Sequence, residues 1–341
     1  MTKTILFGMP AVSEIFKEIE ANLKYYGFNV VSIAELDSNF RYPSLRSRIN
    51  VKFRKHILKD KDAKKDLKCD VLQKEITKRL NANNKADYAL VISGDIYSHQ
   101  FLQFLRGHSI HGLVNYQFDG LSRFPDIWTR ISLFDRCYVF DSDDLTGKDY
   151  SLFPATNFYL DYDLTNLSED VDFYFTGAHM DSRCKMISAF GQYAQDRGKS
   201  LECNIFWNHG TLALAKSIYP NENIRLIDQI ISFSENVQRA KRAKVLLDFV
   251  ISEHKGLSFR VFEALGYRKK LITTNADVLK YDFYHPNNIL VWDGQDFGAI
   301  DKFLEKPYHE IDKTIREKYS FGNWINYILR IEPYTPIDLP Q

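Results

Sequence analysis

The chain has 341 residues, of which 45% are hydrophobic and 26% are charged, and its formal net charge is +1. This length suits two α/β domains, and the composition excludes an intrinsically disordered protein. The small net charge gives no global field that would favour nucleic acid, so no nucleic-acid partner is expected.

The first half of the sequence alternates between apolar runs, which predict strands, and amphipathic stretches, which predict helices. Thr4–Gly8 predicts the first strand, and residues 12–26 predict the first helix, which Gly27 closes. Further strands are expected at 29–34, 87–93, 110–116 and 137–140, with helices inserted over 42–80 and placed at 98–106 and 125–133. This order indicates βαβ units and a parallel sheet.

A second cycle of the same kind follows a polar, turn-prone segment at 161–170, which we expect to link two domains. Its strands are predicted at 172–176, 201–207, 224–230, 244–250, 270–274 and 288–292, and its helices at 183–197, 234–242, 258–266 and 319–331. We therefore predict an α/β protein with two Rossmann-like domains, 1–165 and 166–320, whose parallel sheets face a central cleft. The helix and tail at 321–341 are expected to pack back towards the first domain.

Neither a secretory leader nor a membrane span is predicted. Residues 1–10 lack the apolar core of a signal peptide, and no stretch approaches the roughly 20 apolar residues of a spanning helix. The cysteines, Cys69, Cys137, Cys184 and Cys203, show no CxxC or Cys/His spacing. They predict reduced, buried thiols without a zinc site, so we expect a cytoplasmic protein.

Basic residues clearly outnumber acidic ones between Arg41 and Arg79. A solvated helical face accounts for such a run. The functional alternative is a peripheral contact with an anionic membrane or with a phosphate-bearing acceptor. A nucleic-acid surface is a third alternative, and it predicts steeply salt-dependent affinity.

The segment 246–275 is the most informative part of the chain. A strand ends there, a loop with Gly256 follows, and a helix begins near Ser258, a good N-cap residue. The N-terminus of a helix suits a diphosphate. Three side chains add hydrogen-bond donors: His254, Lys255 and Arg260. Glu263 can accept two hydrogen bonds from a ribose diol, although an ion pair between Arg260 and Glu263 is the alternative.

This segment resembles the donor-binding motif of GT-B glycosyltransferases, especially of bacterial lipopolysaccharide and capsule transferases, including the CgeB-like group. Those enzymes carry a glycine loop, then Arg-x-x-Glu-Ala-Leu on a helix, then a strand that ends in Thr-Thr or Thr-Asp. The matching residues are Gly256, Arg260, Glu263, Ala264, Leu265, Thr273, Thr274 and Asn275. The resemblance implies that Glu263 grips the nucleotide ribose and that the loop 254–258 contacts phosphate or sugar.

The resemblance extends to most of the chain. Gly177 and Arg183 match a glycine loop and a basic residue that approach the donor phosphates, and Gly8 ends the first strand at a ligand-facing position. The family implies transfer of a sugar, from a UDP-sugar by default, to a surface glycan or glycolipid without a metal or other cofactor. The first domain binds the acceptor and the second the donor. Retaining members often carry two glutamates eight positions apart; here Lys255 precedes Glu263 by that spacing, which favours inversion.

An inverting transferase needs a general base near the acceptor hydroxyl. Asp119 is the first candidate because it follows a strand and precedes Gly120, and Asp95 and Glu14 are the reserves. For each, the alternative role is a turn or cap carboxylate. Two Asp-x-Asp patterns, at 141–143 and 161–163, match a metal motif only formally. The loop histidines are expected to be surface or cap residues, with His179 the one to test: His179, His209 and His285.

Three other functions remain open at this stage. A CMP-sugar transferase of sialic acid or Kdo has a similar shape but no second phosphate to neutralise. A non-hydrolysing nucleotide-sugar epimerase shares the architecture and needs no acceptor. A non-catalytic glycan- or nucleotide-binding protein on the same scaffold would bind nucleotide and consume none.

Overall fold

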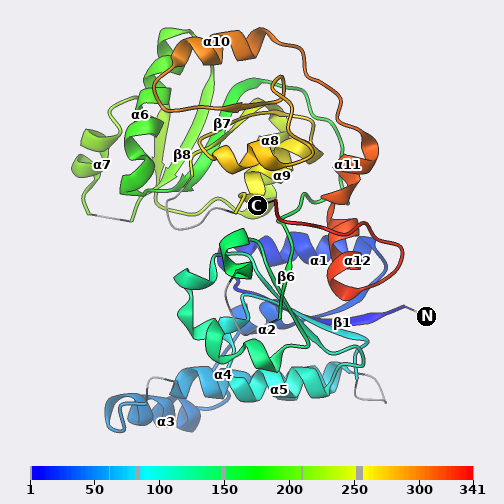
Figure 1. Cartoon of the computed structure of the whole chain (residues 1–341). Coiled ribbons are helices and arrows are strands. Elements are labelled where there is room, and N and C mark those ends of the chain that lie inside the picture. Colours follow the sequence, from blue (N-terminus) through cyan, green and yellow to red (C-terminus); the bar gives the residue numbers. More distant parts are fainter. Residues whose placement is uncertain are drawn as a thin grey trace. The chain divides into compact units, whose positions relative to one another are not determined.

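The computed structural model describes residues 2–60, 62–80, 85–146, 151–208, 210–250 and 256–340. The chain divides into two compact units (Figure 1). Unit 1 comprises Met1–Phe140, Asp144–Ala155 and Ile328–Ile331, and unit 2 comprises Asp141–Asp143, Thr156–Tyr327 and Glu332–Gln341. Each unit is built around one parallel sheet of six strands, which confirms the predicted pair of α/β folds.

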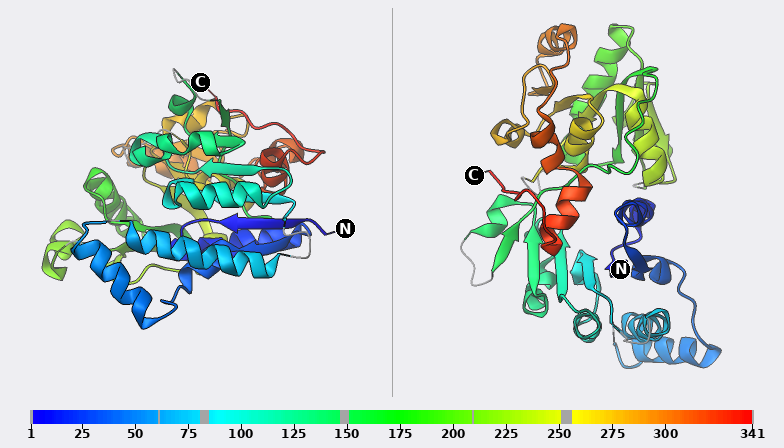
Figure 2. Two further views of the ribbon diagram at one scale, coloured as in Figure 1. Left: turned by 90° about the horizontal axis from the view of Figure 1, so that it is seen from below. Right: turned by 90° about the vertical axis from the view of Figure 1, so that its right-hand side faces the viewer.

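Unit 1 has the strand order β2-β1-β3-β4-β5-β6. Its strands are β1 Thr4–Gly8, β2 Asn29–Ser32, β3 Tyr88–Ile92, β4 Leu113–Gln117, β5 Arg136–Val139 and β6 Leu152–Pro154. Its helices are α1 Ile15–Tyr25, α2 Ile33–Ser38, α3 Leu45–His56, α4 Ala63–Arg79 and α5 His99–Gly107, with short 3-10 turns η1 Val12–Glu14, η2 Gly94–Ile96, η3 Leu121–Arg123, η4 Pro125–Thr129, η5 Ile131–Leu133 and η6 Ser142–Leu145. Every residue of β3 and β4 is buried because α1 covers one face of the sheet and α4 and α5 the other (Figure 2).

Unit 2 has the strand order β12-β11-β10-β7-β8-β9. Its strands are β7 Val171–Ala178, β8 Leu201–Phe206, β9 Ile224–Ile227, β10 Ala243–Asp248, β11 Lys270–Thr273 and β12 Ile289–Val291. Its helices are α6 Asp181–Asp196, α7 Leu212–Ile218, α8 Phe233–Arg242, α9 Phe259–Gly266, α10 Phe297–Glu305, α11 Lys313–Lys318 and α12 Phe321–Leu329, with the 3-10 turn η7 Ala276–Lys280. Helices α6 and α10 pack in one hydrophobic core and α8 and α9 in the other, so both faces of the sheet are covered.

Several elements differ from the prediction. The strand expected at 29–34 ends at Ser32, because the Ser32 hydroxyl accepts a hydrogen bond from the Glu35 amide at 2.9 Å and caps α2. Strand β6 and helices α7, α10 and α11 were not predicted. The segment 161–170 lies within unit 2, where the Asp163 carboxylate accepts a hydrogen bond from Lys241 at 2.9 Å. The chain instead leaves unit 1 after Ala155.

The C-terminal helix α12 serves both units. Its residues up to Tyr327 belong to unit 2, and Ile328–Ile331 belong to unit 1. In unit 1, the Arg330 guanidinium lies 5.4 Å from the centre of the Phe153 ring on β6. Among the described residues, no helix is both long and apolar enough to cross a bilayer.

Glycine closes α9 for a packing reason. A Cβ added at Gly266 would lie 2.2 Å from Cγ of the buried Tyr159 ring.

We expect Gly266→Ala to lower the free energy of unfolding by about 1–3 kcal/mol or more, because the ring or the helix must shift. Gly107, which closes α5, is the matched control: a Cβ there meets nothing within 4 Å. Gly107→Ala should be neutral or stabilising by about 0.5–1 kcal/mol. Urea unfolding of both variants checks this, and equal stabilities would contradict it.

Candidate functional site

The order of strands in unit 2 defines one position where a ligand can bind. The chain winds from β7 outwards to β8 and β9 in one direction, and from β10 outwards to β11 and β12 in the other. Strands β7 and β10 are neighbours in the middle of the sheet. In open α/β sheets, ligands bind beyond the carboxyl ends of the strands at such a reversal. The ends of β7 and β10 are therefore the expected binding edge, which we call the donor edge.

Arg183 lies across the donor edge. From the first turn of α6, its Nη2 donates to the Ala178 carbonyl at 2.6 Å and its Nη1 to the Phe249 carbonyl at 3.1 Å. These carbonyls end β7 and follow β10. Gly177 makes room for the guanidinium, since a Cβ at that position would lie 2.8 Å from Nη2. The structure thus brings the predicted pair Gly177 and Arg183 together and fixes a cation at the reversal point. Gly177 belongs to β7 rather than to the predicted loop.

Asp248, the last residue of β10, organises the other half of this edge. Its Oδ1 accepts from the Ser258 hydroxyl at 2.8 Å, and its Oδ2 accepts from the Thr273 hydroxyl at 2.7 Å. Ser258 occupies the N-cap position of α9, but its side chain accepts no hydrogen bond from this helix. Its hydroxyl donates to Asp248, and a hydroxyl that donates one hydrogen bond can still accept others, so the predicted N-cap position is confirmed while the capping hydrogen bond is not made. The N-terminus of α9 keeps its partial positive charge for a ligand.

The threonines of the motif make hydrogen bonds at the ends of β10 and β11. Thr273 is fully buried, and its hydroxyl also accepts from the Asn275 amide at 3.0 Å. The Thr274 hydroxyl accepts from the Val250 amide at 2.9 Å, and the Asn275 side chain caps η7 by accepting from Asp277. Gly256 precedes α9 and is buried. His254 and Lys255, like His209, lie outside the described residues.

Arg260 and Glu263 form the ion pair that was the alternative to ribose binding. Arg260 Nη1 lies 2.8 Å from Glu263 Oε2, and Nη2 donates to Asn236 Oδ1 at 2.9 Å. The Tyr174 hydroxyl donates to the same oxygen, and its ring lies 5.1 Å from the guanidinium. Glu263 is only 3% exposed, so burial raises the pKa of its carboxyl and Arg260 opposes that rise. Within the described residues, Glu263 Oε1 has no hydrogen-bond partner.

The histidine expectations need one correction. His179 follows β7 but is buried rather than on the surface: its Nδ1 lies 2.9 Å from the Tyr219 hydroxyl, and its ring centre lies 4.6 Å from that of Trp207. A cavity of about 530 Å³ adjoins it at the ends of β7 and β8. His285 stacks on His309 with ring centres 3.8 Å apart.

Unit 1 has its own reversal point, between β1 and β3. Gly8 ends β1 there, and a Cβ at Gly8 would lie 2.7 Å from the buried Tyr97 hydroxyl. This glycine therefore makes room for Tyr97, and it belongs to unit 1 rather than to the unit that carries the donor edge. The assignment of Gly8 to donor binding stays a prediction.

The three candidate bases differ in their surroundings. Asp95 follows β3, and its Oδ1 accepts from the neutral Gln117 amide at 3.1 Å; burial raises the pKa of the Asp95 carboxyl, while this hydrogen bond opposes the rise. Asp119 accepts from Arg123 at 3.1 Å. Glu14 is 53% exposed and pairs with Lys17 at 2.5 Å. A general base is more effective when its pKa lies nearer to neutrality. The burial that raises the pKa of Asp95 therefore favours Asp95 over the first candidate, Asp119.

A basic cavity of about 770 Å³ lies in unit 1 among α3, α4 and the loops that follow β1 and β3. Its basic lining comes from the predicted basic segment: Lys52, Lys55, His56, Lys64, Lys65 and Lys68. Asp37 is the acidic residue of the lining, and it pairs with Lys68 at 2.5 Å. Lys65 also reaches the Asp95 carbonyl at 3.4 Å. The cavity thus offers positive charge next to the favoured base.

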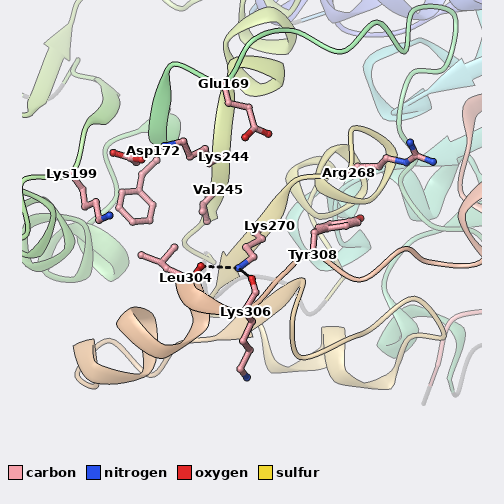
Figure 3. A pocket seen from close by; sticks show the side chains of 11 residues that line it. Glu169, Asp172, Lys199, Lys244, Val245, Arg268, Lys270, Leu304, Lys306 and Tyr308 are labelled. Carbon is pink, nitrogen blue, oxygen red and sulfur yellow. Dashed lines mark hydrogen bonds and ion pairs between the residues drawn. The ribbon is translucent and has the colours of Figure 1, made fainter.

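A second basic cavity, of about 390 Å³, lies at the opposite, amino-terminal edge of the unit 2 sheet (Figure 3). Charged side chains of this cavity make hydrogen bonds and ion pairs within unit 2. Lys270 donates to the carbonyls of Phe303 and Leu304 at 2.8 and 3.2 Å, which closes the end of α10. Lys244 pairs with Asp172 at 2.8 Å.

Of the two Asp-x-Asp patterns, the one at 161–163 is engaged in turns and ion pairs. Hydrogen bonds from Thr165 and Lys241 hold the pKa of Asp163 at about 2, and the Asp161 carboxylate accepts from the Gly322 amide at 3.2 Å. In the other pattern, Asp141 accepts from the Asp143 amide at 3.0 Å. In the part of the chain that the structure describes, no three His, Cys, Asp or Glu residues form a group that could hold a metal ion.

No family model matches this sequence, and no curated protein matches it either. Among solved structures, a glycosyltransferase from Rickettsia africae ESF-5 is similar over 96% of both chains, with 12% identity and a TM-score of 0.52. An alpha-glucosyltransferase in complex with UDP and a 13-mer DNA is similar over 89% of this chain and 90% of that chain, with 12% identity and a TM-score of 0.51. The chain has the GT-B fold. The resemblance seen in the sequence is confirmed at the level of the fold.

Sequence reasoning missed several residues that shape the donor edge of this GT-B chain: Asp248, Asn236 and Tyr174. Asp248 could have been noticed as the carboxylate that ends an apolar strand. Nothing in the sequence indicates that Asn236 and Tyr174 meet Arg260, because these three residues come from α8, β7 and α9.

Removing one partner of a buried ion pair leaves the other charge unpaired. We expect Arg260→Met to lower the free energy of unfolding by about 3–5 kcal/mol near neutral pH. Lys280→Met is the control, since the Lys280–Asp277 pair at 2.8 Å is on the surface; it should cost less than about 1 kcal/mol.

The cost of Arg260→Met should also depend on pH. Burial raises the pKa of Glu263 in the folded protein above its value in the unfolded chain, and loss of Arg260 raises it further. The folded variant then binds more protons, so its stability falls as the pH rises through this range. Urea unfolding should show a larger loss at about pH 8 than at about pH 5. A loss that does not change with pH would contradict the buried-pair interpretation.

Proposed function

We propose that this chain is a metal-independent glycosyltransferase that moves a sugar from a nucleotide-sugar donor to a glycan or glycolipid acceptor. The observation that carries the proposal is the donor edge: Arg183 is fixed across the ends of β7 and β10, and the N-terminus of α9, whose N-cap side chain makes no capping hydrogen bond, is held at the end of β10. A guanidinium and a helix N-terminus are the groups that stabilise a departing diphosphate when no metal does so. The fold agrees with this chemistry.

Glu263 is the proposed ribose contact. Its Oε1 is a buried acceptor with no hydrogen bond among the described residues, and a ribose hydroxyl would satisfy it. Arg260 holds the other oxygen and orients the carboxylate. UDP is the default nucleotide, and the similar alpha-glucosyltransferase was solved with UDP.

The acceptor is proposed to bind in unit 1, with Asp95 as the general base of an inverting reaction. Asp95 would take the proton from the acceptor hydroxyl as that oxygen attacks the anomeric carbon, and the nucleotide diphosphate would leave. The basic cavity beside Asp95 suits an acceptor that bears phosphate. Lipopolysaccharide and capsule precursors are the proposed acceptors of this kind.

Donor binding can be tested by thermal shift against UDP-, GDP-, dTDP-, ADP- and CMP-sugars without added metal. One nucleotide class should stabilise the protein, because a ligand that binds only the folded state raises its melting temperature. We expect Arg183→Gln and Glu263→Ala each to weaken that binding by about 10–100-fold. Arg197→Gln is the control, since Arg197 ends the same helix and pairs on the surface with Asp301 at 2.6 Å.

The same screen separates the alternatives. A response to CMP-sugars alone would indicate the CMP-sugar transferase. Conversion of the donor to its epimer, followed by NMR, would indicate the epimerase. Binding without any donor hydrolysis or transfer would indicate a non-catalytic binder. A folded protein that responds to no nucleotide would refute the proposal.

The base can be tested through hydrolysis of the donor that responds in the screen. Asp95→Asn should lower the rate by about 100-fold or more while nucleotide binding is unchanged. Asp119→Asn should have a small effect. Because burial raises the pKa of Asp95, the wild-type rate of hydrolysis should fall as the pH decreases through that raised pKa. The rate of the Asp95→Asn variant should not show this fall at low pH. The reverse ranking of the two variants would reinstate Asp119.

A further inference from the structure

Helix α3 exposes a continuous apolar stripe. Leu45, Ile49 and Phe53 of α3 and Ile57, which directly follows the helix, are spaced four residues apart and are 73%, 58%, 52% and 64% exposed. Side chains at this spacing lie on one face of a helix. The helix lies at the periphery of unit 1, against α4 and away from the sheet (Figures 1 and 2). A soluble surface rarely leaves such a stripe uncovered, so it indicates an interaction surface.

The opposite face of α3 holds it on the unit. Val51 is the buried residue of this helix. Arg54 reaches Asp60 at 2.5 Å and Asp66 at 3.0 Å, which ties α3 to the start of α4. Ser44 and Ser47 form a capping box at the N-terminus. The stripe therefore belongs to a fixed helix whose outward face is apolar.

Positive charge flanks the stripe on both sides. Arg46 lies beside it on one flank, and Arg48, Lys52 and Lys55 lie on the other, by their positions around the helix. The helix contains no acidic residue. A second copy of this helix would repel it, and a nucleic acid would leave the apolar stripe exposed to water. An anionic lipid surface satisfies both features, because acyl chains accept the apolar face and phosphates accept the cations.

We propose that α3 is a membrane-contact helix that lies in the plane of an anionic bilayer. Its 12 residues span about 18 Å, too short to cross a membrane. The apolar stripe enters the boundary between headgroups and acyl chains, and the flanking cations meet lipid phosphates. Lys52 and Lys55 also line the basic cavity of unit 1, so the mouth of that cavity lies at the same surface. This assignment is independent of the proposed transferase activity.

Vesicle co-sedimentation of the full chain tests the proposal without nucleotide. The wild type should bind vesicles that contain about 30% phosphatidylglycerol and should bind pure phosphatidylcholine vesicles at least about tenfold more weakly. The double variant Ile49→Gln/Phe53→Gln should bind the anionic vesicles at least about tenfold more weakly than the wild type. Arg46→Gln/Arg48→Gln should lose about fivefold per residue and show a weaker salt dependence.

The matched control is Leu212→Gln/Leu214→Gln, because these residues are 58% and 50% exposed on α7 of unit 2. This variant should bind vesicles as the wild type does. All variants should keep the wild-type melting temperature, since every substituted side chain is exposed. A wild type that ignores anionic vesicles, or an α3 double variant that binds them equally well, would overturn the proposal. So would a wild-type dimer, seen in sedimentation equilibrium without vesicles, that the Ile49→Gln/Phe53→Gln variant abolishes.

Discussion

The carboxylate of Asp248 joins three parts of unit 2 at one point. It ends β10, receives the Ser258 hydroxyl at the start of α9, and receives the Thr273 hydroxyl at the end of β11. A buried carboxylate is tolerated because it accepts several hydrogen bonds. The geometry of the donor edge depends on this, because the Ser258 hydroxyl donates to Asp248 and makes no capping hydrogen bond with α9. One carboxylate thereby holds the start of α9 against the ends of β10 and β11.

The second layer of support is polar and buried. Asn236 Oδ1 accepts both the Tyr174 hydroxyl and Arg260, and Arg260 in turn neutralises Glu263. Each member of this network limits the rotamers of the next, so the Glu263 carboxylate is held in one orientation before any ligand arrives. Such pre-organisation lowers the entropic cost of binding and favours a specific contact over an adaptable one.

The fold could be predicted from the sequence because its elements are set locally. Apolar runs such as 243–248 are strands, and a glycine or a cap residue marks most of the boundaries. The failures have a physical cause. Ser32 looks like part of an apolar run, yet its hydroxyl begins α2, and the edge strand β6 is too short to carry a periodic signal.

The site was predictable only in part, because its geometry depends on contacts between residues that are distant in the sequence. The sequence identified Gly177, Arg183, Arg260 and Glu263, and the structure shows that Arg183 is fixed by a carbonyl 66 residues away. The sequence could not reveal that the Ser258 hydroxyl donates a hydrogen bond to Asp248. Nor could it distinguish Asp95 from Asp119, because burial raises the pKa of Asp95 against the hydrogen bond from Gln117, while Asp119 accepts a hydrogen bond from Arg123.

Membership of Ile328–Ile331 in unit 1 has a consequence for biosynthesis. Residues 328–331 complete a unit whose six strands are all encoded before residue 156. The contact of Arg330 with Phe153 is an example. While the ribosome is still translating unit 2, unit 1 lacks these contacts, so its folding is finished only after residue 331 has been made. A fragment that ends at Ala155 is therefore an incomplete unit.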